Sequence, residues 1–349
     1  MIHQRIHRAR MLRGLSLEAL ANRIGDISKQ ALSKFENGAA QPNSTRILQL
    51  ANALNVKPEY FFRSDAIELA PLEFRKLSKM SQARQVSVRE IMHDHLERYE
   101  ALERCFDAEN TVSVLSAQSI PASNAEEAEI AAQQLRNQLN IGHDAIAHLT
   151  ELLEGNGIKV ALLDGPDDFD GACAATHDMQ HVLIGLNRHR AGERVRFTAA
   201  HELGHWVMAL PNHMSDEDKE SCCHRFAGAF LYPKDRVLQD FGHHPRSRVF
   251  PLELLNAKRR YGVSMQVALR RLKDLSLLSN AGYRHAYLEF NQRGWRKHEP
   301  EQLLPERPRR FESLVYRGLA EDLFTPSRAA EFLQCRLDEL DPALDHLAR

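Results

Sequence analysis

One short stretch of the chain combines residue types and a spacing that could hold a metal ion beside a general base. The stretch His201-Glu202-Leu203-Gly204-His205 follows the pattern H-E-x-x-H. On a helix, residues four positions apart lie on one face, so both imidazoles can reach one ion. Glu202, next to the first histidine, could then accept a proton from a water molecule that the ion activates. The motif therefore predicts a metal-dependent hydrolysis with Glu202 as the catalytic base.

The segment around the motif predicts a partly buried helix over residues 193–210. The letters RFTAA before the motif and WVMAL after it are apolar at helical spacing. The alternative is a core helix whose polar residues pair only with one another. Because a buried polar group without a partner costs about 1–3 kcal/mol, the burial of this motif favours a bound ion.

A catalytic zinc site also needs a third protein ligand. The pattern with a third histidine six residues after His205 is excluded, because Pro211 stands there. The next predicted helix, residues 216–231, offers four carboxylates and one imidazole, which belong to Asp216, Glu217, Asp218, Glu220 and His224. Because Glu220 and His224 are four residues apart, His224 could hydrogen-bond to a ligand if Glu220 binds the ion.

The type of ligand and the cysteines bear on which metal is bound and what it does. Two histidines and a carboxylate favour Zn²⁺, and the same set accepts Mn²⁺ or iron. The five cysteines are scattered and form no C-x-x-C motif, which argues against a disulfide framework and agrees with a reducing compartment. Cys222 or Cys223 could instead supply a fourth ligand, which would make the metal site structural or sensing rather than catalytic.

The stretch RFTAAHELGH, followed by ESCCHRFAGAFLYP, resembles the metallo-endopeptidases of the ImmA/IrrE type. The resemblance covers roughly residues 125–280, including the strand-like segments GIKVALL and HVLIGLN. It implies a gluzincin-like endopeptidase in which Glu220 is the third metal ligand, ahead of Glu217. It also implies that the substrate is a protein, namely a repressor or an antitoxin.

The first 63 residues have the pattern of a DNA-binding helix-turn-helix. Residues 17–24 predict its first helix, and residues 28–36 predict the recognition helix, whose N-terminal part would meet base edges in the major groove. Gln30 could bind adenine through two hydrogen bonds, whereas Lys29 and Lys34 suit phosphates. The full set of candidate DNA contacts is Ser28, Lys29, Gln30, Ser33 and Lys34.

The same region resembles the heads of Xre/Cro-type repressors, through the segments SKQALSKFENG and LANALNVKPEYFF. The resemblance implies that the partner is a double-stranded DNA operator. One departure is Leu17, where several relatives have a glutamine that contacts the DNA backbone. A small helical bundle that contacts protein rather than DNA is the alternative. Paired half-sites in operators make a homodimer the expected assembly.

Charge is distributed unevenly over a chain whose net charge is -1. Residues 1–63 hold ten Lys/Arg against four Asp/Glu, and residues 245–310 hold fifteen against six. Such basic stretches suit nucleic acid or acidic partners. For residues 245–310, however, solvated helix surface is the favoured interpretation, with binding to DNA or protein as the alternative.

These elements predict a mainly α-helical protein. Its 349 residues fit two or three domains. We expect a five-helix Xre-type domain at 1–65, a helical linker or oligomerisation arm at 66–120, an α+β gluzincin-like metallopeptidase domain with a small sheet at 121–245, and a helical C-terminal region with a helix-turn-helix-like pair at 246–349. The sequence has no apolar run long enough for a membrane span and no signal peptide, which places the chain in the cytoplasm.

Overall fold

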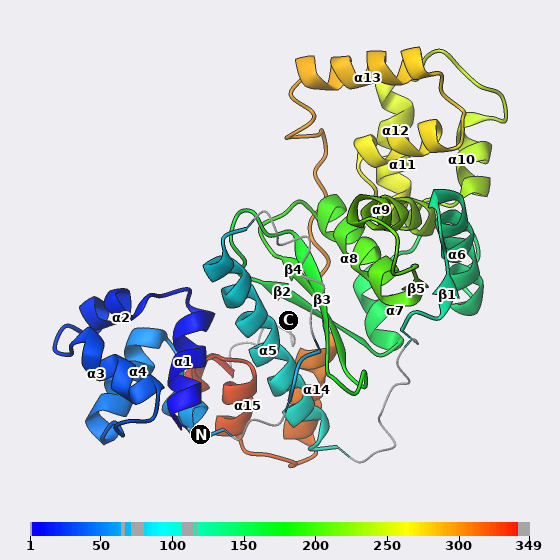
Figure 1. Ribbon diagram of the computed structural model, residues 1–349. Coiled ribbons are helices and arrows are strands. Elements are labelled where there is room, and N and C mark those ends of the chain that lie inside the picture. Colours follow the sequence, from blue (N-terminus) through cyan, green and yellow to red (C-terminus); the bar gives the residue numbers. More distant parts are fainter. Residues whose placement is uncertain (1, 64–66, 71–79, 107–114, 116, 341–349) are drawn as a thin grey trace. The chain divides into compact units, whose positions relative to one another are not determined.

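The computed structural model describes residues 2–63, 67–70, 80–106, 115 and 117–340 (Figure 1). The described chain is mainly helical, as predicted, with small sheets in its middle. Within these residues, no helix is both long enough and apolar enough to cross a membrane. The chain divides into two compact units. Unit 1 comprises residues 1–111, 174–183 and 309–349, and unit 2 comprises residues 112–173 and 184–308.

The head at the start of unit 1 has the five predicted helices. They are α1 (Ile2–Leu12), α2 (Leu17–Ile24), α3 (Lys29–Glu36), α4 (Ser44–Leu54) and the 3₁₀ helix η1 (Pro58–Phe62). Serine and asparagine side chains cap three of them, because Ser16, Ser28 and Asn43 each accept a hydrogen bond from a backbone N–H of the first turn. One apolar core, which includes Leu20, Leu32 and other buried residues, holds the helices together.

A long helix, α5 (Gln82–Glu103), forms the second part of unit 1. It packs against α1 and against α14 (Arg310–Ala320) and α15 (Pro326–Phe332), and α15 in turn contacts the short 3₁₀ helix η4 (Leu337–Glu339). The side chains of Tyr99 and Leu102 are fully buried in this cluster. Of the helical linker or arm predicted over 66–120, residues 66, 71–79, 107–114 and 116 lie outside the described part of the chain.

Unit 2 contains the two helices that carry the predicted metal site, α8 (Gly192–Val207) and α9 (Asp216–Leu231). Its other helices are α6 (Ala125–Gln138), α7 (Leu149–Gly155), α10 (Lys234–Phe241), α11 (Pro251–Tyr261), α12 (Met265–Asp274) and α13 (Asn280–Gln292). Helix α9 packs against α6, α8 and α12, so it lies at the centre of this group.

The small sheet predicted from the sequence has three strands in the order β2-β4-β3. Strands β2 (Ile158–Leu163) and β4 (Val182–Asn187) agree with the strand-like segments GIKVALL and HVLIGLN, and β3 (Gly171–Ala175) lies between them in the sequence. All six residues of β4 are buried, as suits a central strand. A separate parallel pair joins β1 (Ile120–Pro121) to β5 (Met208–Ala209).

The start of α8 is fixed by a segment from much later in the chain. The backbone N–H of Gly192 donates to the carbonyl of Leu303 over 2.8 Å, and the N–H of Leu303 donates to the Glu193 carboxylate over 3.0 Å. The same carboxylate accepts from the fully buried Lys258, at 2.7 Å, and Lys258 also pairs with Glu299. Helix α8 is therefore anchored at its first turn by contacts that no local sequence pattern predicts.

Candidate metal centre and nucleic-acid interface

Helix α8 presents the two motif histidines on one face, as their spacing predicts. The Nε2 atoms of His201 and His205 are 3.1 Å apart, with the ring centroids at 4.9 Å. His201 is 2% exposed and Glu202 is 3% exposed, so this part of the helix is interior. Two imidazole nitrogens that converge at this distance inside a protein suit a shared ion better than a shared proton.

Helix α9 adds a carboxylate to the pair. The Oε1 atom of Glu220 is 3.1 Å from Nε2 of His205, and Oε2 is 3.4 Å from Nε2 of His201. The two helices approach closely because Gly204 has no side chain there. A Cβ atom at Gly204 would come within 2.9 Å of the Phe226 ring on α9. The glycine of the motif thus lets α9 bring Glu220 to the histidines.

The spacing of these donor atoms fits a tetrahedral ion. In zinc sites the metal–nitrogen and metal–oxygen distances are about 2.0–2.2 Å, which separates neighbouring donors by about 3.4 Å. The separations among His201, His205 and Glu220 are 3.1–3.4 Å. The donor set of two imidazoles and one carboxylate leaves a fourth position for water or substrate. The residues present therefore fit a catalytic metal.

His224 lies beside the cluster on the next turn of α9. Its Nδ1 donates to the backbone carbonyl of Glu220 over 2.7 Å. The ring stands edge-on to His201, with centroids 4.5 Å apart. His201, Glu220 and His224 also form a group whose ligand atoms are within 4.8 Å of one another. His224 is thus close enough to orient a metal ligand or to bind the ion itself.

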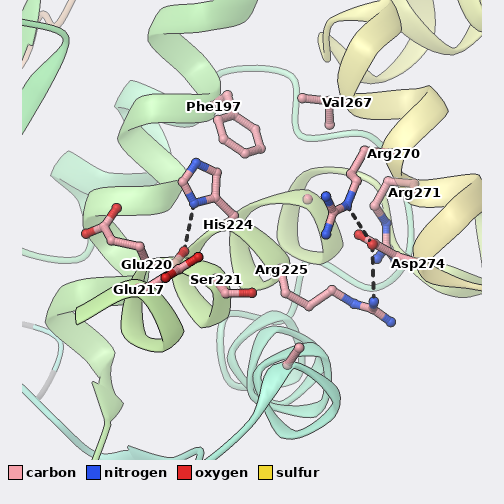
Figure 2. Close-up of a pocket in the computed structure, with 12 residues that line it drawn as sticks. Phe197, Glu217, Glu220, Ser221, His224, Arg225, Val267, Arg270, Arg271 and Asp274 are labelled. Carbon is pink, nitrogen blue, oxygen red and sulfur yellow. Dashed lines mark hydrogen bonds and ion pairs between the residues drawn. The ribbon is translucent and has the colours of Figure 1, made fainter. Parts of the chain in front are cut away.

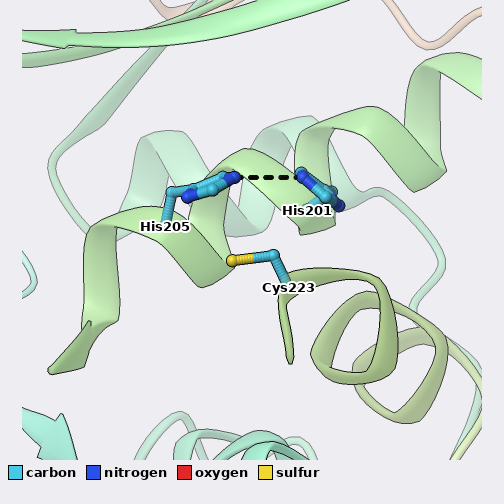
Figure 3. A group of neighbouring side chains, drawn as sticks. All are labelled: His201, His205 and Cys223. Atoms are coloured by element: carbon cyan, nitrogen blue, oxygen red, sulfur yellow. Dashed lines mark hydrogen bonds between the residues drawn. The ribbon is translucent and has the colours of Figure 1, made fainter. Parts of the chain in front are cut away.

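Cys223, which also belongs to α9, lies next to the two histidines (Figure 3). Its sulfur and the ligand nitrogens of His201 and His205 are all within 4.8 Å of one another, and the residue is completely buried. The neighbouring Cys222 has no place in either group of possible ligands among the described residues. Of the two cysteines that the sequence left open as a fourth ligand, Cys223 is therefore the one at the site.

The predicted recognition helix is α3, and its bounds agree with the sequence pattern. Ser28, Lys29, Gln30 and Lys34 are exposed, while Ser33 is half-buried. The hydroxyl of Ser28 caps the helix by accepting from the backbone N–H of Ala31 over 3.2 Å. The head thus presents the candidate DNA contacts in the order in which a helix-turn-helix uses them, from the helix N-terminus onward.

Two family models match the chain on these two regions. The helix-turn-helix family matches residues 6–61. The peptidase family described as IrrE N-terminal-like domain matches residues 155–273. The chain is a fusion of these two domains. A comparison with curated proteins gives no match. The resemblances predicted from the motifs are confirmed, and they make the chain a DNA-binding regulator with a metallopeptidase-like domain.

The IrrE-like domain explains part of the basic stretch 245–310. Lys258 and Arg271 are 0% and 1% exposed, and both are paired with carboxylates. Arg259, by contrast, is exposed and pairs with Glu301. Part of the positive charge in this stretch is therefore buried. Its ion pairs hold α11 and α12 to the rest of the domain. The sequence pattern could not separate these buried cations from the solvated ones.

Proposed function

We propose that this protein is an operator-binding regulator of the cytoplasm whose IrrE-like domain is a metal-dependent endopeptidase that cleaves a partner protein. The observation that carries the proposal is the convergence of His201, His205 and Glu220 at 3.1–3.4 Å, with Glu202 on the same helix as the histidines. A repressor or antitoxin as substrate would link cleavage to gene expression. The paired half-sites of operators support a homodimer on DNA.

In this proposal the three residues would hold Zn²⁺, or Mn²⁺, and the ion would act as a Lewis acid that polarises water and the peptide carbonyl. Glu202 accepts a proton from the attacking water and passes it to the leaving amine. Its buried position beside His201 keeps the carboxylate away from bulk solvent. His224, one turn after Glu220 on α9, stands edge-on to the ring of His201 and would help to orient that ligand.

The first test is metal stoichiometry by elemental analysis. We expect one metal per chain in the wild type, and loss or strong weakening of binding in Glu220→Ala. Glu217→Ala is the matched control, because Glu217 lies three residues earlier on the same helix and is the alternative carboxylate ligand that the sequence offers. Absence of metal from the wild type after reconstitution with zinc and with manganese would remove the proposal.

The second test separates metal binding from catalysis. We expect Glu202→Gln to keep the metal and to lose cleavage by a factor of about 10²–10⁴, because a general base contributes about that much. Cleavage of a denatured protein mixture would be followed by mass spectrometry of the products. If Glu202→Gln cleaves as well as the wild type, the peptidase assignment fails even though the metal site stands.

A second candidate function is a DNA-binding regulator with a structural or sensing metal and no proteolysis. The position of Cys223 beside both histidines favours it, because a fourth protein ligand would close the site. Substitution with Co²⁺ distinguishes the two functions. A thiolate-to-cobalt absorption band that disappears in Cys223→Ser would support the closed site, whereas a spectrum that is unchanged by Cys223→Ser would support the open, catalytic one.

A further inference from the structure

The cations around the pocket beside the metal ligands are neutralised within the domain. This pocket, of about 370 Å³, lies among α8, α9 and α12 (Figure 2). Arg271 of α12 and Arg225 of α9 both bind the Glu129 carboxylate. Arg270 donates to Asp274 over 2.8 Å. Guanidinium groups that are satisfied in this way do not call for an anionic partner.

The surface of α13 and of the residues after it carries positive charge that is not neutralised in this way. From residue 273 to residue 298 the chain has five Lys/Arg against two Asp/Glu. Both carboxylates are already bound, Asp274 by Arg270 and Glu289 by Arg293. Over the described part of the chain, no carboxylate pairs with the other four cations, all of which are exposed: Lys273, Arg284, Arg296 and Lys297.

Two of these four cations are held over tyrosine rings. Tyr283 and Tyr287 are four residues apart on α13, and their rings stack with centroids 6.1 Å apart. The ammonium group of Lys273 lies 4.7 Å from the centre of the Tyr283 ring. The guanidinium group of Arg296 lies 4.8 Å from the centre of the Tyr287 ring. A cation on a ring keeps N–H donors for other acceptors, and its restricted side chain loses less entropy on binding.

The face of α13 that carries the tyrosines bears no carboxylate. Arg284 is three residues before Tyr287, so the two side chains are neighbours on the helix surface. Glu289, the one carboxylate in the sequence of α13, is two residues after Tyr287, a spacing that puts it on a different face. The exposed imidazoles of His285 and His298 add no negative charge. This face therefore suits a partner that is itself negatively charged.

We propose that the cationic face of α13, formed by Lys273, Arg284, Arg296 and Lys297, binds the phosphate backbone of double-stranded DNA without reading its sequence. Lysine and arginine donors suit phosphates, which every sequence presents in the same way. Because Tyr283 and Tyr287 each carry a cation on the ring, they offer no open platform on which an unpaired base could stack. The inference does not depend on the proposed peptidase activity.

The head of the chain favours DNA over an acidic protein as the partner of this face. It matches the helix-turn-helix family, so the chain already binds duplex DNA. A duplex held by the head stays at a high local concentration for a second contact of the same chain, even when that contact is weak by itself. Helix α13 has 13 residues and is about 20 Å long, a length over which a duplex presents about twelve phosphate charges.

The test measures the affinity of the full-length protein for a duplex of random sequence at several salt concentrations. In the triple variant Lys273→Gln, Arg284→Gln, Arg296→Gln, the slope of log affinity against log salt should become shallower by about 2.7, because each lost phosphate contact removes about 0.9. The matched control changes the net charge equally at exposed arginines that carboxylates already pair, in the triple variant Arg259→Gln, Arg317→Gln, Arg336→Gln. No change in the first variant, or an equal change in both, would overturn the inference.

Two further variants keep this test independent of misfolding and of the head. Lys273→Arg combined with Arg284→Lys and Arg296→Lys conserves the charge and should keep the wild-type slope and the wild-type metal content. The change caused by the three glutamines should persist when Lys29→Ala and Lys34→Ala weaken the head. A change that disappears in that background would belong to the head and would refute the proposed surface.

Acetylation of lysines gives a measurement on the wild-type chain. Duplex DNA should protect Lys273 and Lys297 from acetylation, and it should leave Lys234, which is exposed on α10, as reactive as before. Mass spectrometry of the digested protein measures this protection. Unprotected Lys273 and Lys297 at saturating DNA would contradict the inference. So would stronger protection by single-stranded DNA or by polyglutamate than by the duplex, since the partner would then belong to another class.

Discussion

At the scale of single residues, burial decides the protonation state of His95, a histidine of unit 1. The ring of His95 packs near Phe311, with centroids 5.4 Å apart, and its Nδ1 accepts from Arg98 over 3.2 Å. Loss of hydration and the positive charge of Arg98 lower the pKa of His95 to about 3, although Asp94 acts in the opposite direction. The imidazole is thus neutral in the folded chain at any moderate pH.

This neutral imidazole predicts a loss of stability in mild acid. Below the ordinary pKa of 6.5, the unfolded chain binds a proton at His95 that the folded chain does not bind. The free energy of unfolding should therefore decrease as pH falls from 6.5 towards 3, by up to about 1.4 kcal/mol for each pH unit. Urea denaturation at pH 7, 6 and 5 measures this slope. It should flatten in His95→Gln and not in the control His189→Gln, where the imidazole is exposed. Equal slopes in all three proteins would contradict the prediction.

Among the candidate metal ligands, only the two histidines could be predicted from their spacing along one helix. His201 and His205 are four residues apart, and helical geometry alone places them together. The position of Glu220 depends on how α9 packs against α8, which no local pattern specifies, so the sequence placed it only through a family resemblance. Cys223 and the pocket residue Val267 depend on the same packing, so their proximity to the site became visible only in three dimensions.

At the scale of helices, a buried group of charges ties α6, α9 and α12 together behind the pocket. Glu129 of α6 binds Arg271 of α12 and Arg225 of α9. Burial opposes ionisation of this carboxyl, but its hydrogen bonds to the two guanidinium groups prevail and lower the pKa of Glu129 below 4.5. The lowered pKa means that the ion pairs stabilise the domain above pH 4.5 and lose this effect as the pH falls further.

Glu129→Gln should destabilise the chain by about 3 kcal/mol, because it leaves two guanidinium groups short of a buried counter-charge. Thermal unfolding at pH 7 measures the loss. The control is Glu126→Gln, on an exposed position of the same helix, which should change little. The difference between Glu129→Gln and wild type should also shrink below pH 4. A difference that stays constant down to pH 3 would mean that the carboxylate charge is not responsible.

Most helices and strands were predictable, and the departures have identifiable causes. Helix α7 begins only at Leu149, because the carbonyls of Asp144 and Ile146 accept hydrogen bonds from Arg136 and Arg196 instead of from the helix backbone. The helix expected over 193–210 ends at Val207, because Met208 and Ala209 pair with Ile120 and Pro121. Both causes are tertiary contacts that override local propensity.

At the scale of the whole chain, two family domains share one polypeptide, and their charge patterns differ. The head contributes exposed polar and basic side chains on α3, whereas the buried cations of residues 245–310 form internal ion pairs.

The predicted domain boundaries near residues 65, 120 and 245 remain predictions. So does the oligomerisation arm: α5 buries nine of its residues within unit 1, which leaves fewer side chains for a partner chain.

The head makes a prediction about DNA. On an operator selected from random duplexes, Gln30→Ala should cost about 1–3 kcal/mol and relax the preference at one base pair. Lys34→Ala should weaken binding equally on all sequences and reduce the slope of log affinity against log salt by about 1. Titrations at several salt concentrations measure both effects. A uniform loss across sequences in Gln30→Ala would show that Gln30 contacts phosphate rather than a base.

The first turn of α8 is completed by Leu303, which lies 110 residues after Glu193. A gene fragment that stops at residue 273, where the family match ends, would encode both histidines and Glu220, yet lack Glu299 and Leu303. Because Glu306 also binds Arg196 and Thr150, we expect the shortest metal-binding product to end no earlier than that residue. We therefore expect a premature stop codon just before position 299 to leave the whole motif readable in the gene and the proposed metal site unformed.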